Sequence, residues 1–525
     1  MLALEDLAGV SVRSSLLLSL SVLLLLLHLW LQAQRRPPGP FPWPVVGNAP
    51  QMGAAPHRYF SRLARRYGDV FQIRLGSRAV VVLNGDAIRR ALVQKGADFA
   101  GRPDFTSFRV VSDGRSMAFG DYGPRWKLHR RVAHAAVRAL SAGDARARAS
   151  FERHVLSEVT LLLRRFLRRT AEETFFQPHA DCLVSTANIM SALCFGSRYS
   201  HDDREFRQVV GRNADFTRTV GAGSIVDVMP WLQYFPNPIQ TLYRQFTELN
   251  REFSGFVRGK VAEHRRSAAA GVTRDMTDAL IFALDKGLGG AAGAFLGGEY
   301  VSPTISDIFG ASQDTLSTAL HWIVLILVRY PEVQTQLRVE VDKVVARSRL
   351  PTIEDQARLP YVMAFIYEVM RFTSFVPITI PHSTTSDTSI DGYHIPKNTV
   401  VFINQWSNNH NPAKWDRPEV FNPLRFMSQD DVLDKDLASN VLIFSVGKRR
   451  CIGEDLSKIQ LFLFTSLLVH QCTFTADPSQ PLRLDYEYGL TLKPNPYRIA
   501  VTLRDSMDLL KEAVEPQPRG DGAQS

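Results

Sequence analysis

The most informative ten residues of the chain read Phe444-Ser-Val-Gly447-Lys-Arg449-Arg-Cys451-Ile-Gly453. One cysteine lies here in a turn that contains several cations, and an apolar segment of helical character follows it. Guanidinium groups and the positive end of a helix favour the ionised form of a thiol. Gly447 and Gly453 allow the backbone to approach a flat ligand without a Cβ in the way. The sequence therefore predicts that Cys451 binds a metal as a thiolate; the alternative is a buried structural cysteine.

The composition of the 525 residues limits the class of protein. A hydrophobic content of 45% can build one very large core or two to three ordinary ones. The four cysteines are few and scattered, and no CxxC occurs, so a disulfide framework, a zinc ribbon and covalently attached haem are all unsupported. The net charge of +10 is spread over amphipathic stretches, without a zinc-finger, RNP-like or basic-zipper pattern. We therefore expect no nucleic-acid partner.

The N-terminal region has the composition of a membrane anchor. Residues 14–31 are mostly apolar and carry no formal charge. A bilayer core needs about 20 apolar residues in a helix, so residues 7–31, with Arg13 near one end, just span it. Arg35 and Arg36 follow, which places the rest of the chain in the cytosol. A cleaved secretory signal is the competing interpretation, but prolines follow at once instead of a cleavage site. We expect four parts: an anchor over 1–34, a proline-rich hinge over 35–49, one catalytic domain over 50–505 and a disordered tail over 506–525.

Residue periodicity predicts a mainly α protein with small β-sheets and no internal repeat. Helical patterns dominate from about Asp86 onward. Short β-strands are expected over 70–75, 79–83, 388–396 and 399–403, and a glycine-rich loop over 287–298. This pattern favours a helical enzyme with sheets at one side.

A long helix is predicted over 302–330, with Ser302 as its N-cap and Pro331 beyond its end. Such a helix is roughly 40 Å long and can cross a whole domain. Small and polar residues interrupt its apolar sequence, namely Asp307, Gly310, Ala311, Asp314 and Thr315. Carboxylates inside a buried helix are costly unless they are paired or functional. The helix is therefore a candidate wall of an active site.

Two motifs together resemble the cytochrome P450 family. The F-x-x-G-x-R-x-C-x-G spacing is similar to the haem-thiolate signature, and residues 311–315 (ASQDT) are similar to the oxygen-activation motif. Ser312 replaces the usual glycine of that motif, and Leu316 replaces a frequent threonine or serine. The resemblance implies the P450 fold and haem b with Cys451 as the axial ligand. It also implies that Thr315 and Asp314 are the catalytic pair that delivers protons.

The resemblance implies further roles for individual residues. The residues that it implies for cofactor binding are Trp126, Arg130, His382, Phe444, Arg449 and Gly453. Glu368 and Arg371 form an ExxR pair that, taken alone, predicts only a surface ion pair. With Arg425 they resemble the family's structural network, which holds the loop before the cysteine.

Residues 114–119, 219–231 and 308–315 resemble P450 family 1, most closely its subfamily B, with subfamily C as the alternative. That family oxidises planar aromatic and steroid-like molecules. Its substrates include polycyclic aromatic hydrocarbons, oestrogens, retinoids, fatty acids and xenobiotics. The implied substrate contacts are Phe119, Asn213, Phe216, Phe253, Asp307, Gly310, Ala311, Val376 and Leu490. For each phenylalanine, ordinary core packing is an equal competitor. The physiological substrate and the position of oxidation stay open.

The resemblance implies a microsomal monooxygenase on the endoplasmic reticulum membrane, with its catalytic domain facing the cytosol; a mitochondrial fraction stays open. Electrons would come from NADPH through NADPH–cytochrome P450 reductase, with cytochrome b5 as a further partner. We expect the acidic reductase to dock on basic residues near the cysteine, namely Lys127, Arg131, Lys448 and Arg450. Two alternatives remain: a haem-thiolate isomerase or dehydratase, which needs no external electrons, and a non-catalytic haem sensor.

Overall fold

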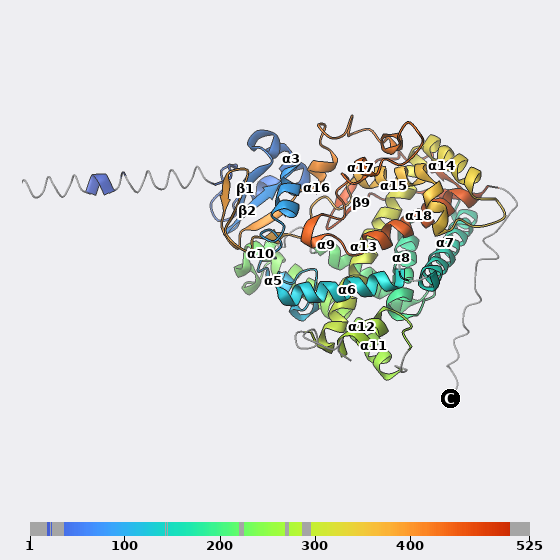
Figure 1. Cartoon of the computed structure of the whole chain (residues 1–525), viewed down its shortest axis with the longest axis horizontal. Coiled ribbons are helices and arrows are strands. Elements are labelled where there is room, and N and C mark those ends of the chain that lie inside the picture. Colours follow the sequence, from blue (N-terminus) through green and yellow to red (C-terminus); the bar gives the residue numbers. More distant parts are fainter. Residues whose placement is uncertain are drawn as a thin grey trace, which may run out of the picture.

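The structure is a computed structural model that describes residues 18–21, 23, 36–141, 143, 145–219, 225–267, 272–285 and 296–504. The side chains of residues 140, 141 and 212–219 are also outside the description. Helices make up most of it, and β1 and β2 lie at the left end of the described body (Figure 1). The predicted fold class, mainly α with small sheets, is confirmed.

The helices differ widely in length. The longer ones are α3 (Pro56–Tyr67), α6 (Pro124–Ser141), α7 (Ala145–Glu173), α8 (His179–Phe195), α9 (Arg204–Thr219), α11 (Pro238–Arg266), α12 (Met276–Asp285), α13 (Val301–Arg329), α14 (Pro331–Val344), α15 (Pro360–Thr373) and α18 (Glu454–Gln471). The short α-helices are α2 (Ala49–Met52), α4 (Ala87–Arg89), α5 (Thr106–Val110), α10 (Ile225–Val228), α16 (Gln405–Asn409) and α17 (Lys435–Ala438). A π turn, η1 (Arg90–Gln94), and 3-10 turns join them: η2 (Val111–Gly114), η3 (Pro230–Tyr234), η4 (Gly298–Tyr300), η5 (Ile353–Arg358), η6 (Pro423–Phe426) and η7 (Gly447–Arg449).

One sheet has four strands in the order β1 (Val70–Leu75), β2 (Arg78–Leu83), β6 (Val400–Ile403) and β3 (His382–Ser383). The β2–β6 pair is parallel, with Val80 opposite Val400, and the other two pairs are antiparallel. Three antiparallel pairs complete the β structure: β4 (Thr388–Ile390) with β5 (Tyr393–Ile395), β7 (Cys472–Ala476) with β10 (Ile499–Leu503), and β8 (Tyr486–Tyr488) with β9 (Leu492–Pro494). The strands predicted from the early and middle sequence are confirmed. Those after residue 471 had no prediction, because strands of three to five residues show little alternation.

Helix α13 runs through the middle of the helical part and packs along α8. Its predicted end at Arg329 is confirmed, but the predicted N-cap at Ser302 is wrong. The 3-10 turn η4 leads directly into the helix, which begins at Val301, so Ser302 already lies inside it. Within the described ranges, residues 298–329 form one helix apolar and long enough to span a membrane, yet 83% of its apolar window is buried in the protein. It is a core helix.

The predicted hinge lies against the body of the protein. Pro38 O accepts a hydrogen bond from Gln72 N at 2.8 Å, and Arg74 O accepts one from Asn48 N at 2.6 Å. The chain therefore joins the edge of β1 before residue 50. Of the predicted anchor, residues 18–21 and 23 are described, as helix; the predicted tail and most of the glycine-rich loop lie outside the described residues.

Candidate functional site

A cavity of about 320 Å³ lies between α13 and the turn that carries Cys451. It brings together fourteen of the predicted site residues: Trp126, Arg130, Asp307, Gly310, Ala311, Asp314, Thr315, Val376, His382, Phe444, Arg449, Cys451, Gly453 and Leu490. Most of the remaining wall is aliphatic or aromatic. A cavity with apolar walls and a few convergent polar groups is typical of a cofactor or small-molecule site.

Two predicted substrate contacts, Phe119 and Phe253, are not among the residues that line this cavity. Phe119 packs on Phe108, with ring centroids 4.7 Å apart, and Phe253 stacks on Phe309 at 5.9 Å. Both rings therefore pack as in the alternative interpretation of the sequence, ordinary core packing. Asn213 and Phe216 belong to α9, but their side chains are outside the described residues.

Cys451 is the cysteine whose side chain reaches the cavity; Cys182, Cys194 and Cys472 are buried in the core. Its backbone N–H donates to Phe444 O at 2.8 Å, which fixes the turn. Gly447 has φ +75°, and a Cβ there would lie 1.9 Å from Leu92 O, so this position requires glycine.

The sequence predicts that the protein lowers the pKa of the Cys451 thiol, but the protein by itself raises this pKa. Burial raises its pKa, and this effect exceeds the lowering by the Gly453 N–H and by Arg130 and Arg450. A metal bound to Sγ would reverse the balance, because coordination removes the thiol proton outright.

Three guanidinium groups meet at one edge of the cavity. Arg449 donates to Ala100 O and Gly120 O, each at 2.8 Å, and to Met117 O at 3.3 Å. Arg102 donates to Ala118 O, Ile380 O and Pro381 O, and Arg130 to Arg450 O. All of these acceptors are carbonyls. Burial, assisted by the neighbouring Arg130, lowers the pKa of Arg449 to about 9, although the Asp121 carboxylate acts to raise it.

Trp126 and His382 also line this edge of the cavity, and a ring N–H of each donates a hydrogen bond to a backbone carbonyl. The Trp126 Nε1–H donates to Met117 O at 2.8 Å, while its ring lies 4.0 Å from the guanidinium carbon of Arg449. His382 Nδ1 donates to Phe99 O at 2.7 Å. Burial and the cations Arg102 and Arg449 hold the pKa of His382 well below its usual range, so the imidazole is neutral.

This donor set fits an iron porphyrin. The cavity offers one thiol for an axial metal bond, apolar walls for a flat macrocycle and an edge of three cations whose described side-chain hydrogen bonds go to carbonyls, with Asp121 as a nearby carboxylate. Two carboxylates at that edge would supply the missing opposite charge, because a buried cation is costly until it is paired.

On the opposite wall, α13 presents the predicted catalytic pair. Thr315 Oγ1 donates to Ala311 O at 2.8 Å within the helix. Asp314 is 2% exposed, and its carboxylate forms an ion pair with Lys493 Nζ at 2.7 Å and accepts a hydrogen bond from Thr491 Oγ1 at 2.8 Å. Both partners belong to the hairpin of β8 and β9, in which the sequence connects Leu490 with the site but not Thr491 or Lys493.

Asp307 holds a loop at the cavity wall. Its carboxylate accepts hydrogen bonds from Ser116 Oγ at 2.8 Å, Met117 N at 2.5 Å and Ala118 N at 3.1 Å. Burial raises its pKa to about 6, although these donors act to lower it. The structure therefore gives the predicted substrate contact a second role, which is to fix the loop that carries Met117 and Ala118.

The structure also brings together the predicted structural network. Glu368 accepts from Arg371 Nε at 2.7 Å and from Arg425 Nε at 3.0 Å. Arg371 also donates to Asn409 O and Pro418 O, each at 2.9 Å. Glu368 and Arg371 are fully buried, so the network holds α15 against residues 409–425, which precede the cysteine turn in the chain.

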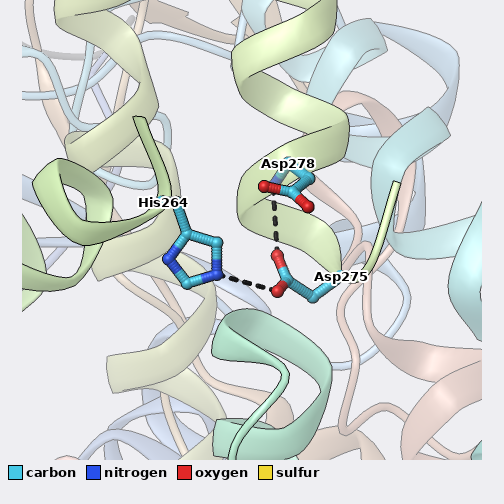
Figure 2. Close-up of side chains that lie close together, drawn as sticks. All are labelled: His264, Asp275 and Asp278. Atoms are coloured by element: carbon cyan, nitrogen blue, oxygen red, sulfur yellow. Dashed lines mark hydrogen bonds and ion pairs between the residues drawn. The ribbon is translucent and has the colours of Figure 1, made fainter. Parts of the chain in front are cut away.

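A second polar cluster, His264, Asp275 and Asp278, lies away from the cavity (Figure 2). Figure 2 shows the His264 ring directed at Asp275, with Nε2 2.8 Å from Oδ2. His264 Nδ1 donates to Lys260 O, and the Asp278 carboxylate accepts from the Arg274 guanidinium. Because these groups already have protein partners, the cluster is a clamp between α11 and α12 and not a metal site.

Sequence-based reasoning missed Arg102, Thr491 and Lys493. Arg102 stands between Gly101 and Pro103 without a charged neighbour that would mark it, and the two hairpin residues lie more than 170 positions from Asp314. Only the three-dimensional packing reveals their roles.

Comparison with known proteins supports the same assignment. A family model described as cytochrome P450 matches residues 37–501. The cytochrome P450 1B1 of Homo sapiens is 58% identical over 484 residues, which cover 91% of this chain and 89% of that relative. The one from Mus musculus is 57% identical over the same shares. The cytochrome P450 1A1 of Cavia porcellus is 42% identical over 463 residues, 87% of this chain and 89% of the relative. With the cysteine cavity, the family match and these identities, the chain belongs to the cytochrome P450 family, in its family 1 and subfamily B.

Proposed function

We propose that the protein is a haem-thiolate monooxygenase of the unspecific monooxygenase class (EC 1.14.14.1). One oxygen atom of O2 enters the substrate and the other becomes water, which consumes two electrons and two protons. Haem b, held by Cys451, would supply the oxygen chemistry. The observation that carries the proposal is that Cys451 and Thr315 line the same cavity from opposite walls.

The chain's own residues would hold the cofactor and move protons. Arg102, Arg130 and Arg449 bind its carboxylates, with His382 as a neutral neighbour, and Trp126 supports the guanidinium of Arg449. Thr315 and Asp314 supply protons from the α13 side. A haem-thiolate isomerase or dehydratase needs no such supply, so the acid–threonine pair at the cavity argues against that alternative.

The cavity wall favours planar, apolar substrates. Phe375, Val376, Ile378 and Leu490 line it together with α13, which presents the small residues Gly310 and Ala311. Aromatic and aliphatic walls with a small-residue face suit flat rings. We therefore propose polycyclic aromatic and steroid-like molecules as the substrate class, with hydroxylation or epoxidation as the reaction.

We propose that the anchor over 1–34 fixes the protein to the endoplasmic reticulum, with the catalytic domain in the cytosol. Large apolar side chains are exposed at Phe41, Trp43 and Val45, which directly follow this segment. Trp231 is half exposed and lines a surface groove together with Trp43 and Val45. Exposed aromatic side chains that cluster in this way are typical of a surface that meets a membrane.

NADPH–cytochrome P450 reductase is the proposed electron donor, with cytochrome b5 as a second partner. Lys127, Arg131, Lys448 and Arg450 are all exposed, and the contact of Arg130 with Arg450 O joins α6 to the cysteine turn. Arg450 forms an ion pair with Glu454 at 2.6 Å, so its charge is partly offset. Charge reversal at Lys448 should raise the reductase concentration needed for half-maximal turnover.

A reduced carbon monoxide difference spectrum tests the central claim. We expect the full-length protein to give the band of a thiolate-bound haem and Cys451→Ser to lose it. Cys472→Ala, which removes a buried thiol away from the cavity, is the matched control and should keep the band. Product formation with NADPH and reductase then separates a monooxygenase from a haem sensor, which would bind haem without consuming NADPH.

A further inference from the structure

A surface groove lies where three segments of the chain meet. These segments are the hinge, the turn between β1 and β2, and the residues from α10 to η3. Among the described residues, none lines both this groove and the cavity of Cys451. We call it the hinge groove. Its volume is about 430 Å³, and the residues that line it include Trp43, Val45, Arg74, Gly76, Ser77 and Trp231.

Two glycines bring the three segments into direct contact. Gly47 has φ +65°, and a Cβ there would lie 2.2 Å from Arg74 O, so the hinge packs on the backbone of β1. Gly76 has φ +56°, and a Cβ there would lie 2.4 Å from Val228 O, so the β1–β2 turn packs on α10. The Gly76 N–H also donates to Val46 O at 3.2 Å. The hinge groove is therefore formed by closely packed backbone and not by loosely placed side chains.

The walls of the hinge groove expose large apolar side chains. Trp43 is 60% exposed, Trp231 50% and Val45 73%. Val45 also has φ +64°, which is uncommon for a β-branched residue, in a turn that two hydrogen bonds between Trp43 and Gly47 close. Backbone strain of this kind is found at ligand-binding sites. Exposed apolar side chains around a hollow indicate a surface that binds a partner or a ligand.

The charge of the hinge groove is positive. Arg74 is exposed, and its Nε donates to Gly76 O at 3.3 Å. Within the part of the chain that the structure describes, Arg74 forms no ion pair, and the groove lining contains no acidic side chain. The Ser77 hydroxyl is a second polar group of the lining. Because a guanidinium pairs with a carboxylate through two parallel N–H···O bonds, the groove is complementary to an anion.

The combination of apolar walls with one cation selects the class of ligand. A peptide would place backbone N–H and C=O groups against walls that offer few hydrogen-bond partners, which is costly. A neutral lipid would leave the charge of Arg74 without a partner. An apolar chain with one anionic end satisfies both the walls and the guanidinium.

We propose that the hinge groove binds a long-chain carboxylate, with the anionic end at Arg74 and Ser77 and the chain along the wall that Trp43 and Trp231 form. The bound ligand would lie outside the cavity of Cys451. The inference goes beyond the proposed monooxygenase function and does not depend on it.

The first test measures binding of palmitate. The full-length, haem-loaded protein is placed in phosphatidylcholine nanodiscs, which carry no net charge, and is labelled with a photoreactive palmitate. Mass spectrometry should find the label on the peptides that contain Trp43 and Trp231. Arg74→Met should raise the palmitate concentration for half-maximal labelling about ten to a hundred times. Arg65→Met, at an exposed arginine of α3 outside the groove lining, is the matched control and should leave it unchanged.

The second test removes the charge from the ligand. The methyl ester of the photoreactive palmitate should label the wild type as weakly as palmitate labels Arg74→Met, and Arg74→Met should not weaken the ester further. Trp231→Ala, which shortens the apolar wall, should weaken palmitate and its ester alike. If palmitate and its ester label the wild type equally, Arg74 does not bind the carboxylate and the proposal is overturned. This comparison needs no variant, so it decides even if Arg74→Met loses the thiolate spectrum.

Two further outcomes would assign the groove differently. If the label falls on α13 and follows a shift of the haem Soret band, palmitate binds only in the cavity of Cys451, and the proposal is overturned. The proposal also fails if Arg74→Met keeps its palmitate labelling and loses only its preference for nanodiscs that contain phosphatidylserine, because the ligand is then a phospholipid. None of these measurements uses turnover, so a failure of the monooxygenase function would leave their results intact.

Discussion

Two groups of buried arginines lie near the Cys451 turn, and they differ in the groups that offset their charge. Arg371 and Arg425 share the carboxylate of Glu368 at 2.7 and 3.0 Å. The guanidinium groups of Arg102 and Arg449, at the cavity, donate to carbonyl oxygens in their described hydrogen bonds, and Asp121, which accepts from Arg102 N at 3.0 Å, is a carboxylate near both. The first group is complete within the protein, whereas the second has an excess of positive charge.

The difference separates structure from ligand binding. A buried cation that is paired stabilises the fold, because removal of its partner leaves an uncompensated charge. A set of buried cations with an excess of positive charge destabilises the fold until an anionic ligand binds. The same cations then contribute to the affinity for that ligand. The two groups should therefore respond oppositely to the presence of haem.

The largest effect is expected at the paired group. Glu368→Gln leaves Arg371 and Arg425 buried without a charge partner, which should reduce the free energy of unfolding by about 3–5 kcal/mol. Denaturant unfolding of the haem-loaded protein measures it. Arg251→Met removes one half of an exposed ion pair with Glu248 and should change stability by at most about 0.5 kcal/mol. Equal losses in the two variants would show that burial of the pair does not matter.

The unpaired group should respond through the cofactor. Arg449→Met removes a guanidinium from the cation edge, and a hydrogen bond to a charged group contributes about 1.5–3 kcal/mol. Haem transfer to an acceptor protein should therefore be about ten to a hundred times faster than from the wild type. Arg449→Lys keeps the charge and should fall between the two. If Arg449→Met releases haem at the wild-type rate, the cation edge does not bind the propionates.

The sequence was sufficient for the half of the site that depends on local spacing. Cys451, Arg449 and Gly447 lie within five residues, so one turn determines their relative positions, and Ala311 and Thr315 share a helix face because they are four residues apart. The Glu368–Arg371 pair followed from the same helical spacing.

Contacts that depend on packing between distant segments could not be predicted in this way. Lys493 reaches Asp314 because Leu492 is tied to Trp322 and Phe375, and no spacing rule links residues so far apart in the chain. Arg102 faces the cavity because its backbone continues from the contact of Gly101 with Ser383. The N-cap at Ser302 failed for a local reason, since a 3-10 turn before the helix moved its start to Val301.

A buried acid without a cationic partner should show the reverse of the Glu368 behaviour. Burial raises the pKa of Asp307 to about 6, above the ordinary value of 3.8, and its described partners are neutral. A raised carboxyl pKa contributes stability that is present below pH 4 and is lost as the pH rises through 6. Between pH 5 and 7.5, the free energy of unfolding should fall by about 1.4 kcal/mol more in the wild type than in Asp307→Asn. Parallel stability curves for the two proteins would contradict the shifted pKa.

The smallest effect is expected at His264, which is paired like Glu368 but can lose its charge. The Asp275 carboxylate, 2.8 Å away, raises the pKa of His264 above the ordinary 6.5. A raised histidine pKa gives stability that is fully present below pH 6.5 and is lost as the pH rises through the folded value, so the melting temperature should fall over that range. His264→Gln should remove this dependence, and Asp275→Asn should remove it as well. If both variants keep the wild-type slope above pH 6.5, His264 is not charged in the folded protein. In that case, the pairing of opposite charges does not account for the stability that buried ions contribute to this fold.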